Sequence, residues 1–166
     1  MKNRKPCILV SACLYGQNVR YDGKSKPIDL SNLETQNVTF VPICPECMGG
    51  LSIPRTPCEI EPEKTAKDVW SGKAKVVDIT GQNKTAAYMK GSRRCLELAT
   101  RHRADAVLLK DKSPACGSSF VYSGDFSSTL KEGRGVTAEL LHENGFRIFS
   151  ENDIPLLVNY LQNSNN

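Results

Sequence analysis

The 166-residue sequence lacks the features that mark several large classes of protein. It has no apolar run long enough to span a membrane, and the run at residues 8–10, behind a basic start, is too short for a signal-peptide core. Lysine and arginine are spread along the chain and do not form a basic stripe with interleaved aromatic residues. We therefore expect a cytoplasmic protein with no membrane association and no stable binding to nucleic acid.

A disulfide framework is also absent, although the chain has seven cysteines. The number is odd, and the cytoplasm keeps thiols reduced, so thiol, thiolate or metal chemistry is expected instead. With 39% hydrophobic and 24% charged residues, the chain is long enough for a single core without disulfides. We expect residues 1–166 to form one domain that ends in a flexible polar tail at 162–166. Nothing in the sequence indicates an oligomeric state.

The spacing of apolar residues predicts an α/β domain. Core strands, buried on both faces, are expected at residues 7–12, 38–43, 105–109 and 146–149. Helices are expected at 29–34, 85–103, 133–145 and 153–161. A further strand is expected at 75–80, whereas 48–72 has prolines and glycines without sustained periodicity, which is typical of a functional segment. The alternation predicts a single Rossmann-like domain with a mainly parallel sheet of four core strands and flanking helices.

Three of the predicted strands are followed by a cysteine: Cys13, Cys44 and Cys116. The carboxyl ends of parallel strands meet at one edge of the sheet, where ligands of such folds bind. The fold would therefore gather thiols that lie far apart in the sequence, which indicates a soft metal or a cluster. Three thiolates with no obvious fourth leave one coordination position open, as is typical of a catalytic centre.

Cys44 and Cys47 form a Cys-x-x-Cys, which fits a redox dithiol, half of a metal site or two unremarkable thiols. The redox interpretation requires a helix, and two glycines and a proline just after Met48 disfavour one. Pro45 predicts a stiff, extended segment that places Cys44 and Glu46 on one side and Cys47 on the other.

Zinc in a closed tetrahedron of Cys13, Cys44, Cys47 and Cys116 is the alternative to an open centre. The stiffness of the segment around Pro45 disfavours it. Cys58 is a further candidate for a fourth ligand.

Other chemistry-bearing residues have plain structural interpretations. Cys95 falls on the inner stripe of a helix and reads as a core residue, and His102 and His142 read as surface. Glu151 reads as part of a helix start. Four residues fit either substrate binding or ion pairs and hydrogen bonds that stabilise loops: Arg20, Asp22, Arg55 and Glu59.

Several segments together resemble a small bacterial family that includes the thiouracil desulfidases. They are 11–16 (SACLYG), 19–23 (VRYDG), 44–46 (CPE), 49–51 (GGL) with 54–55 (PR), 113–117 (SPACG) and 135–138 (GVTA). The resemblance extends from residue 11 to about residue 151. The blocks are specific in combination, although none is specific alone.

The resemblance implies a [4Fe-4S] cluster held by Cys13, Cys44 and Cys116, with one iron free to bind the sulfur of a thiolated pyrimidine. Glu46 would transfer protons, and Ser113 would orient the substrate by a hydrogen bond. The small-molecule substrate would give uracil and sulfide without net redox change. An open iron is exposed to oxygen, so aerobically handled protein would lose the cluster.

A second hypothesis, from a different class, is a non-enzymatic zinc-binding structural or interaction module. It predicts stoichiometric zinc, a colourless protein and a loss of stability on chelation.

Overall fold

The computed structural model describes residues 4–164 and is built around one parallel sheet. Its strands are β1 (Cys7–Ser11), β2 (Thr39–Ile43), β5 (Ala106–Leu109) and β8 (Ile148–Ser150). They lie in the order β2-β1-β5-β8, and every neighbouring pair is parallel. The predicted Rossmann-like α/β fold with four core parallel strands is therefore confirmed.

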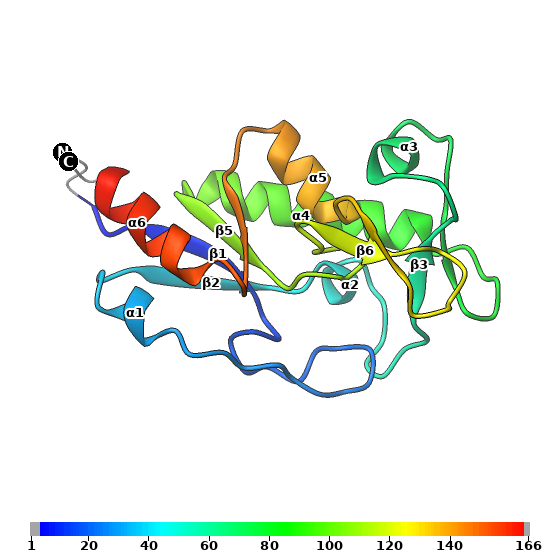
Figure 1. Ribbon diagram of the computed structural model, residues 1–166, viewed down its shortest axis with the longest axis horizontal. Helices are drawn as coiled ribbons and strands as arrows, with labels where there is room; N and C mark the ends of the chain where they lie inside the picture. Colours follow the sequence, from blue (N-terminus) through cyan, green and yellow to red (C-terminus); the bar gives the residue numbers. More distant parts are fainter. Residues whose placement is uncertain (1–3, 165–166) are drawn as a thin grey trace.

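Both faces of this sheet are covered, which explains why β1 is an unbroken apolar run and not an alternating one. Leu9 points to a core shared with α4 and α5, whereas its neighbour Ile8 points to a core shared with α1 and α6. The helices are α1 (Ser31–Glu34), α4 (Thr85–Arg101), α5 (Val136–Glu143) and α6 (Ile154–Ser164). Figure 1 shows α1 and α6 near one end of the molecule, with α4 running along the sheet.

Two antiparallel ribbons and a short helix lie beyond the carboxyl ends of the central strands (Figure 1). The ribbons pair β3 (Cys58–Ile60) with β4 (Val76–Asp78) and β6 (Phe120–Tyr122) with β7 (Leu130–Glu132). β4 confirms the further strand expected near residues 75–80. These small elements form walls around the edge of the sheet where the predicted cysteines are found.

The expectation that 48–72 has no regular structure is wrong. β3 and the helix α3 (Ala66–Trp70) lie within it. α3 begins at a capping box in which the side chains of Thr65 and Asp68 each accept from the backbone N–H of the other. Both elements are too short to show a period, so they could not be recognised from hydrophobic spacing.

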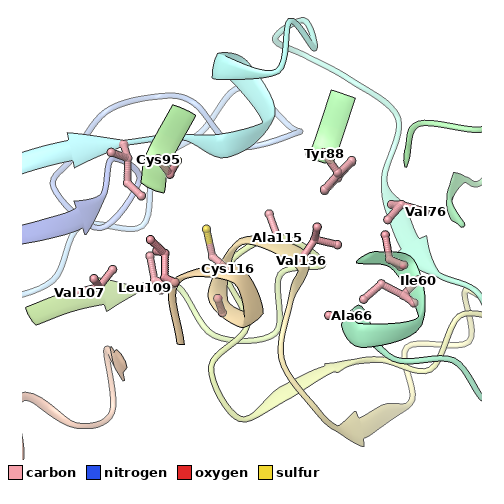
Figure 2. Packing of buried hydrophobic residues seen from close by; sticks show 14 of the residues in the cluster. Ile60, Ala66, Val76, Tyr88, Cys95, Val107, Leu109, Ala115, Cys116 and Val136 are labelled. Atoms are coloured by element: carbon pink, nitrogen blue, oxygen red, sulfur yellow. The ribbon is translucent and has the colours of Figure 1, made fainter. Parts of the chain in front are cut away.

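One core cluster extends from the central sheet into the region of the ribbons. Figure 2 shows Val107 and Leu109 of β5 toward one end, Ala115 and Cys116 in the middle, and Ile60 of β3 toward the other end. The loop that carries Cys116 is therefore part of the packed interior.

The segment after β2 differs most from the sequence-based expectation. Residues Pro45–Met48 form the short helix α2, with Cys44 as its extended N-cap, so the prediction of an extended 44–46 segment is wrong. Proline suits the first turn of a helix because the N–H that it lacks would have no partner there.

The close packing of α2 against α4 depends on two glycines, one on each side of the contact. A Cβ on Gly91 of α4 would clash with the carbonyl of Pro45, and a Cβ on Gly49 would clash with the carbonyl of Ala87. α2 and α4 therefore approach closely because both positions lack a side chain, and this contact fixes where Cys44 and Glu46 lie.

The long helices follow their expected spans with small differences. α4 and α5 are each slightly shorter than predicted, and α6 continues to Ser164, into the polar tail expected at 162–166. Residues 165–166 of that tail lie outside the described residues. No helix within residues 4–164 is both long and apolar enough to cross a membrane.

Candidate active site

A cavity of about 520 Å³ lies at the carboxyl edge of the parallel sheet. Cys13 follows β1, Cys44 follows β2 and Cys116 lies in the loop after β5, and all three line this cavity. Glu46 and Ser113 line it as well. The structure therefore brings all five sequence-predicted site residues to one place.

A tight backbone turn holds Cys13. The Ala12 N–H donates to the carbonyl of Ile43 at 2.7 Å, which ties the end of β1 to the end of β2. The Gly16 N–H donates to the Cys13 carbonyl at 3.3 Å, and Gly16 has a φ of +94°, which a glycine adopts without strain. Cys13 is buried in this turn and lines the cavity.

Ser113 organises the turn that carries Cys116. Its Oγ accepts hydrogen bonds from the backbone N–H groups of Ala115 at 3.2 Å and of Cys116 at 3.1 Å. Ser113 therefore stabilises this turn, and its position on the cavity wall leaves a role toward substrate open.

The first turn of α5 holds the same loop from behind. The N–H groups of Val136 and Thr137 donate to the carbonyls of Pro114 and Ala115 at 2.8 and 2.9 Å. The first N–H groups of a helix have no acceptor within the helix, so they are available for this contact. A Cβ at Gly135 would clash with Ala115, so a glycine is needed at this junction.

Asp111 is a structural residue of the site that the sequence did not single out. Its Oδ1 accepts three backbone N–H groups, from Ser118, Ser119 and Phe120, at 3.0 to 3.2 Å. Burial acts to raise the pKa of this carboxyl, but these hydrogen bonds outweigh it and lower the pKa below its usual range. Asp111 is thus held ionised as the anchor of the loop that follows Cys116.

Glu151 joins the ends of two strands, which corrects its interpretation as part of a helix start. Its carboxylate accepts from Lys110 Nζ at 2.6 Å and from the Asp111 N–H at 2.8 Å. The Ser150 hydroxyl, in contrast, does bond the Asp153 carboxylate before α6, at 3.0 Å. The partners of Glu151 lie on another strand, so no local sequence pattern could reveal them.

Glu46 is buried on the cavity wall, in the first turn of α2. One carboxylate oxygen, Oε2, lies 3.8 Å from Arg55 Nη2 and 3.7 Å from Cys44 Sγ. Arg55 Nη2 also donates to the Val19 carbonyl at 3.0 Å. The guanidinium therefore connects the catalytic candidate to the loop that leads out of the Cys13 turn.

The three thiols lie in surroundings that oppose their ionisation. Burial, followed by the negative charge of Glu46, raises the pKa of Cys13 to about 11. The same two causes raise the pKa of Cys44 and of Cys116, and nearby Cys13 and Cys44 raise that of Cys116 further. The thiols are thus close enough to influence one another, and an added positive charge such as a metal centre would favour their thiolate forms.

The residues present fit a cluster better than a single ion. Among residues 4–164, no three His, Cys, Asp or Glu side chains are placed to hold one metal ion. Cys47 is not part of the cavity lining that Cys13, Cys44 and Cys116 share, so the four sulfurs considered for zinc do not surround one point. Three soft donors spread around a cavity suit a larger group whose metal atoms each take one thiolate, as in an iron–sulfur cluster.

The four residues with two sequence interpretations all have protein partners. Arg20 Nη1 lies 3.7 Å from Asp22 Oδ2, and Glu59 Oε2 accepts from the Phe126 N–H at 2.9 Å. Arg55 has the contacts described above. The stabilising interpretation therefore holds, and three of the four also line the cavity: Arg20, Arg55 and Glu59.

Tyr88, a buried residue of α4, is a second cavity residue that sequence reasoning did not single out for the site. Burial and then the charge of Glu46 raise its pKa well above the usual range, so its phenol stays neutral. Cys58 lies beside it on the cavity wall. The expected core role of Cys95 is confirmed, and His102 and His142 are exposed as expected.

This geometry defines an α/β protein whose parallel sheet gathers three thiols and a buried carboxylate around one cavity. The chain belongs to the 2-thiouracil desulfurase family, whose sequence model matches residues 8–153. This range agrees with the resemblance inferred from the motif blocks.

Two similar proteins extend over nearly the whole chain. The uncharacterized protein YbbK of Bacillus subtilis (strain 168) is 43% identical over 147 residues, which cover 89% of this chain and 97% of YbbK. A solved structure of a [4Fe-4S]-dependent thiouracil desulfidase, TudS, matches with a TM-score of 0.83 and 37% identity. That match covers 95% of this chain and 99% of TudS.

Proposed function

We propose that this protein is an iron–sulfur-dependent desulfidase that removes sulfur from a thiolated pyrimidine such as 2-thiouracil. The observation that carries the proposal is the meeting of Cys13, Cys44 and Cys116 with Glu46 at one cavity. The similarity to TudS over almost all of both chains supports it.

Cys13, Cys44 and Cys116 would hold a [4Fe-4S] cluster, one thiolate to each of three irons. When bound, the cluster supplies an iron with an open coordination position, which acts as a Lewis acid toward the departing sulfur. The chain contributes three thiols on three separate loops, each fixed by backbone hydrogen bonds or by the N-cap of a helix. Such fixed ligands need no rearrangement when the group binds.

Glu46 is the residue in position to move protons. Its carboxylate is buried on the cavity wall and held from one side by Arg55, which leaves the other oxygen, Oε1, for water or substrate. A carboxylate in this position accepts a proton from the attacking water and returns it to the ring or to the departing sulfur. The change exchanges the thiocarbonyl sulfur for a water oxygen, gives uracil and sulfide, and transfers no electrons.

Ser113 is suited to orient the substrate. A serine hydroxyl offers one O–H donor and two acceptor positions, and the N–H groups of Ala115 and Cys116 occupy the acceptor side. Its own hydrogen has no acceptor among the described residues, and the side chain lines the cavity. It is therefore available to donate to a carbonyl or ring nitrogen of the base.

We place this activity in the cytoplasm. A reducing compartment keeps the seven free cysteines as thiols and suits an oxygen-sensitive cluster.

The test is turnover of 2-thiouracil by protein purified and reconstituted without oxygen. We expect uracil and sulfide in equal amounts, with no added electron donor or acceptor. Glu46→Gln is the variant that tests the proton-transfer role, because it keeps the size of the side chain but cannot take up a proton. It should retain iron, and its turnover should fall by a factor of about 10² to 10⁴. A fully active Glu46→Gln variant would remove the proposed proton-transfer role.

A further inference from the structure

Cys44 and Cys47 differ from the other five cysteines of the chain. Those five are buried, whereas Cys44 and Cys47 are partly exposed. The two sulfurs lie near the same backbone carbonyl, that of Val19, at 3.9 and 4.0 Å. They are therefore two accessible thiols that face one point.

The helix α2 gives these thiols the geometry of a dithiol. Cys44 is the N-cap of α2 and Cys47 lies three residues on, so both side chains are on the same side of one helical turn. Residues three positions apart on a helical turn have Cβ atoms about 5–6 Å apart, so a small backbone adjustment at the start of α2 brings them to the roughly 4 Å that a disulfide needs.

The other cysteines are less suitable partners for either thiol. Cys13 and Cys116 are buried on separate loops that backbone hydrogen bonds hold in place. Cys95 is in the core, with its sulfur against Met48 Sδ at 3.7 Å. A disulfide between α2 and any of these would require movement of the backbone.

We infer that Cys44 and Cys47 form an oxidative modification site, which closes to a disulfide when the cluster is absent. The oxidant is a small disulfide such as oxidised glutathione. One protein thiolate attacks it and releases one glutathione thiol, and the second protein thiolate then displaces the other glutathione from the mixed disulfide. The two cysteines lose two electrons and two protons, and glutathione disulfide takes up both as two thiols.

The consequence for the site rests on the proposed function. Cys44 cannot bind iron while its sulfur is bonded to Cys47, so the disulfide and the cluster exclude each other. Reduction restores both thiols, whereas further oxidation of a lone Cys44 to sulfinic acid would be irreversible. Cys47, which is outside the cavity lining and accepts a hydrogen bond from Arg55 Nη1 at 3.9 Å, thus protects a ligand without being one.

The test uses full-length, cluster-free protein incubated with oxidised glutathione, followed by alkylation and peptide mass spectrometry. We expect the peptide with both cysteines to be lighter by two hydrogen atoms, to resist alkylation, and to recover after treatment with dithiothreitol. Cys47→Ser should instead carry glutathione on Cys44. The matched control is Cys7→Ala, which removes a buried cysteine outside the cavity and should still form the disulfide.

Two results would overturn the inference. One is glutathione on Cys44 and Cys47 separately in the wild-type protein, without an internal bond; the other is a disulfide from Cys44 to Cys13 or Cys116. Reduced Cys47→Ser protein should also bind as much iron as wild type, and a loss of iron would make Cys47 a ligand. The disulfide mapping needs no cluster. It therefore tests whether Cys44 and Cys47 form a disulfide even if the protein proves to have no desulfidase activity.

Discussion

Arg55 and Glu46 form the charge pair that fixes the proton-transfer group of the site, with Nη2 and Oε2 at 3.8 Å and both side chains largely buried. The same nitrogen donates to the Val19 carbonyl at 3.0 Å. Arg55 is neither a proposed cluster ligand nor the proton-transfer group, so we interpret it as a residue that positions Glu46.

Replacing Arg55 by glutamine should lower kcat by up to about a hundredfold, because the carboxylate loses its fixed orientation. Iron content should stay unchanged, because Arg55 is not one of the three proposed ligands. Arg93→Gln is the matched control: Arg93 stacks on Trp70, outside the cavity lining, and its loss should leave kcat as it is. An unchanged kcat in Arg55→Gln would show that the pair has no role in positioning.

Ser113 combines a turn contact with a proposed substrate contact, and two variants separate them. Ser113→Ala should raise KM about fivefold through the lost hydrogen bond to substrate and destabilise the turn by about 1 kcal/mol. Ser113→Thr keeps the hydroxyl and should restore most of the substrate affinity and most of the stability of the turn. Steady-state sulfide release and urea unfolding measure the two effects; a Thr variant as impaired as the Ala variant would speak against the hydroxyl.

The close contact of α2 with α4 makes Gly91 intolerant of a side chain. Alanine normally favours a helix over glycine, but here its methyl group would push against the Pro45 carbonyl. Gly91→Ala should therefore destabilise the fold by about 1 to 3 kcal/mol and lower the iron content. The control is Lys90→Ala, at the neighbouring exposed position of α4, whose unfolding free energy should barely change. Stabilisation by Gly91→Ala would contradict the described packing.

The Asp111 carboxylate should make stability depend on pH. Its pKa is lower in the folded protein than in the unfolded chain, so its stabilisation is complete above about pH 4 and is lost as the pH falls further, toward the folded-state pKa. Asp111→Asn should cost about 1 kcal/mol or more at neutral pH. Urea unfolding of cluster-free protein gives the free energy of unfolding of wild type and of Asp111→Asn. The difference between the two should become smaller at about pH 3. A gap of constant size would mean that the charge contributes nothing.

The sequence was most informative where a physical pattern was local. Buried apolar runs predicted the four parallel strands. The rule that the carboxyl ends of such strands meet at one edge then predicted that Cys13, Cys44 and Cys116 lie around one site. Pro45 and Gly49 misled the prediction, because helix propensity says nothing about a neighbouring helix that requires a glycine.

The remaining site residues were hidden because their partners are distant. Arg55 contacts Val19 and Glu46, and Glu151 contacts Lys110 and the backbone of Asp111. No pattern within one segment encodes such pairs, since they arise only when separate loops meet at the sheet edge. The role of Tyr88 as a cavity wall was hidden for the same reason.

The central claim is that the three cysteines at the sheet edge hold a [4Fe-4S] cluster. The most direct measurement is a visible absorption spectrum, with iron, sulfide and zinc analysis, on protein purified without oxygen. The account predicts a brown protein with about four irons and four sulfides per chain, and loss of the colour in Cys13→Ser, Cys44→Ser and Cys116→Ser. A colourless protein with one zinc per chain would contradict it and favour a zinc-binding structural module.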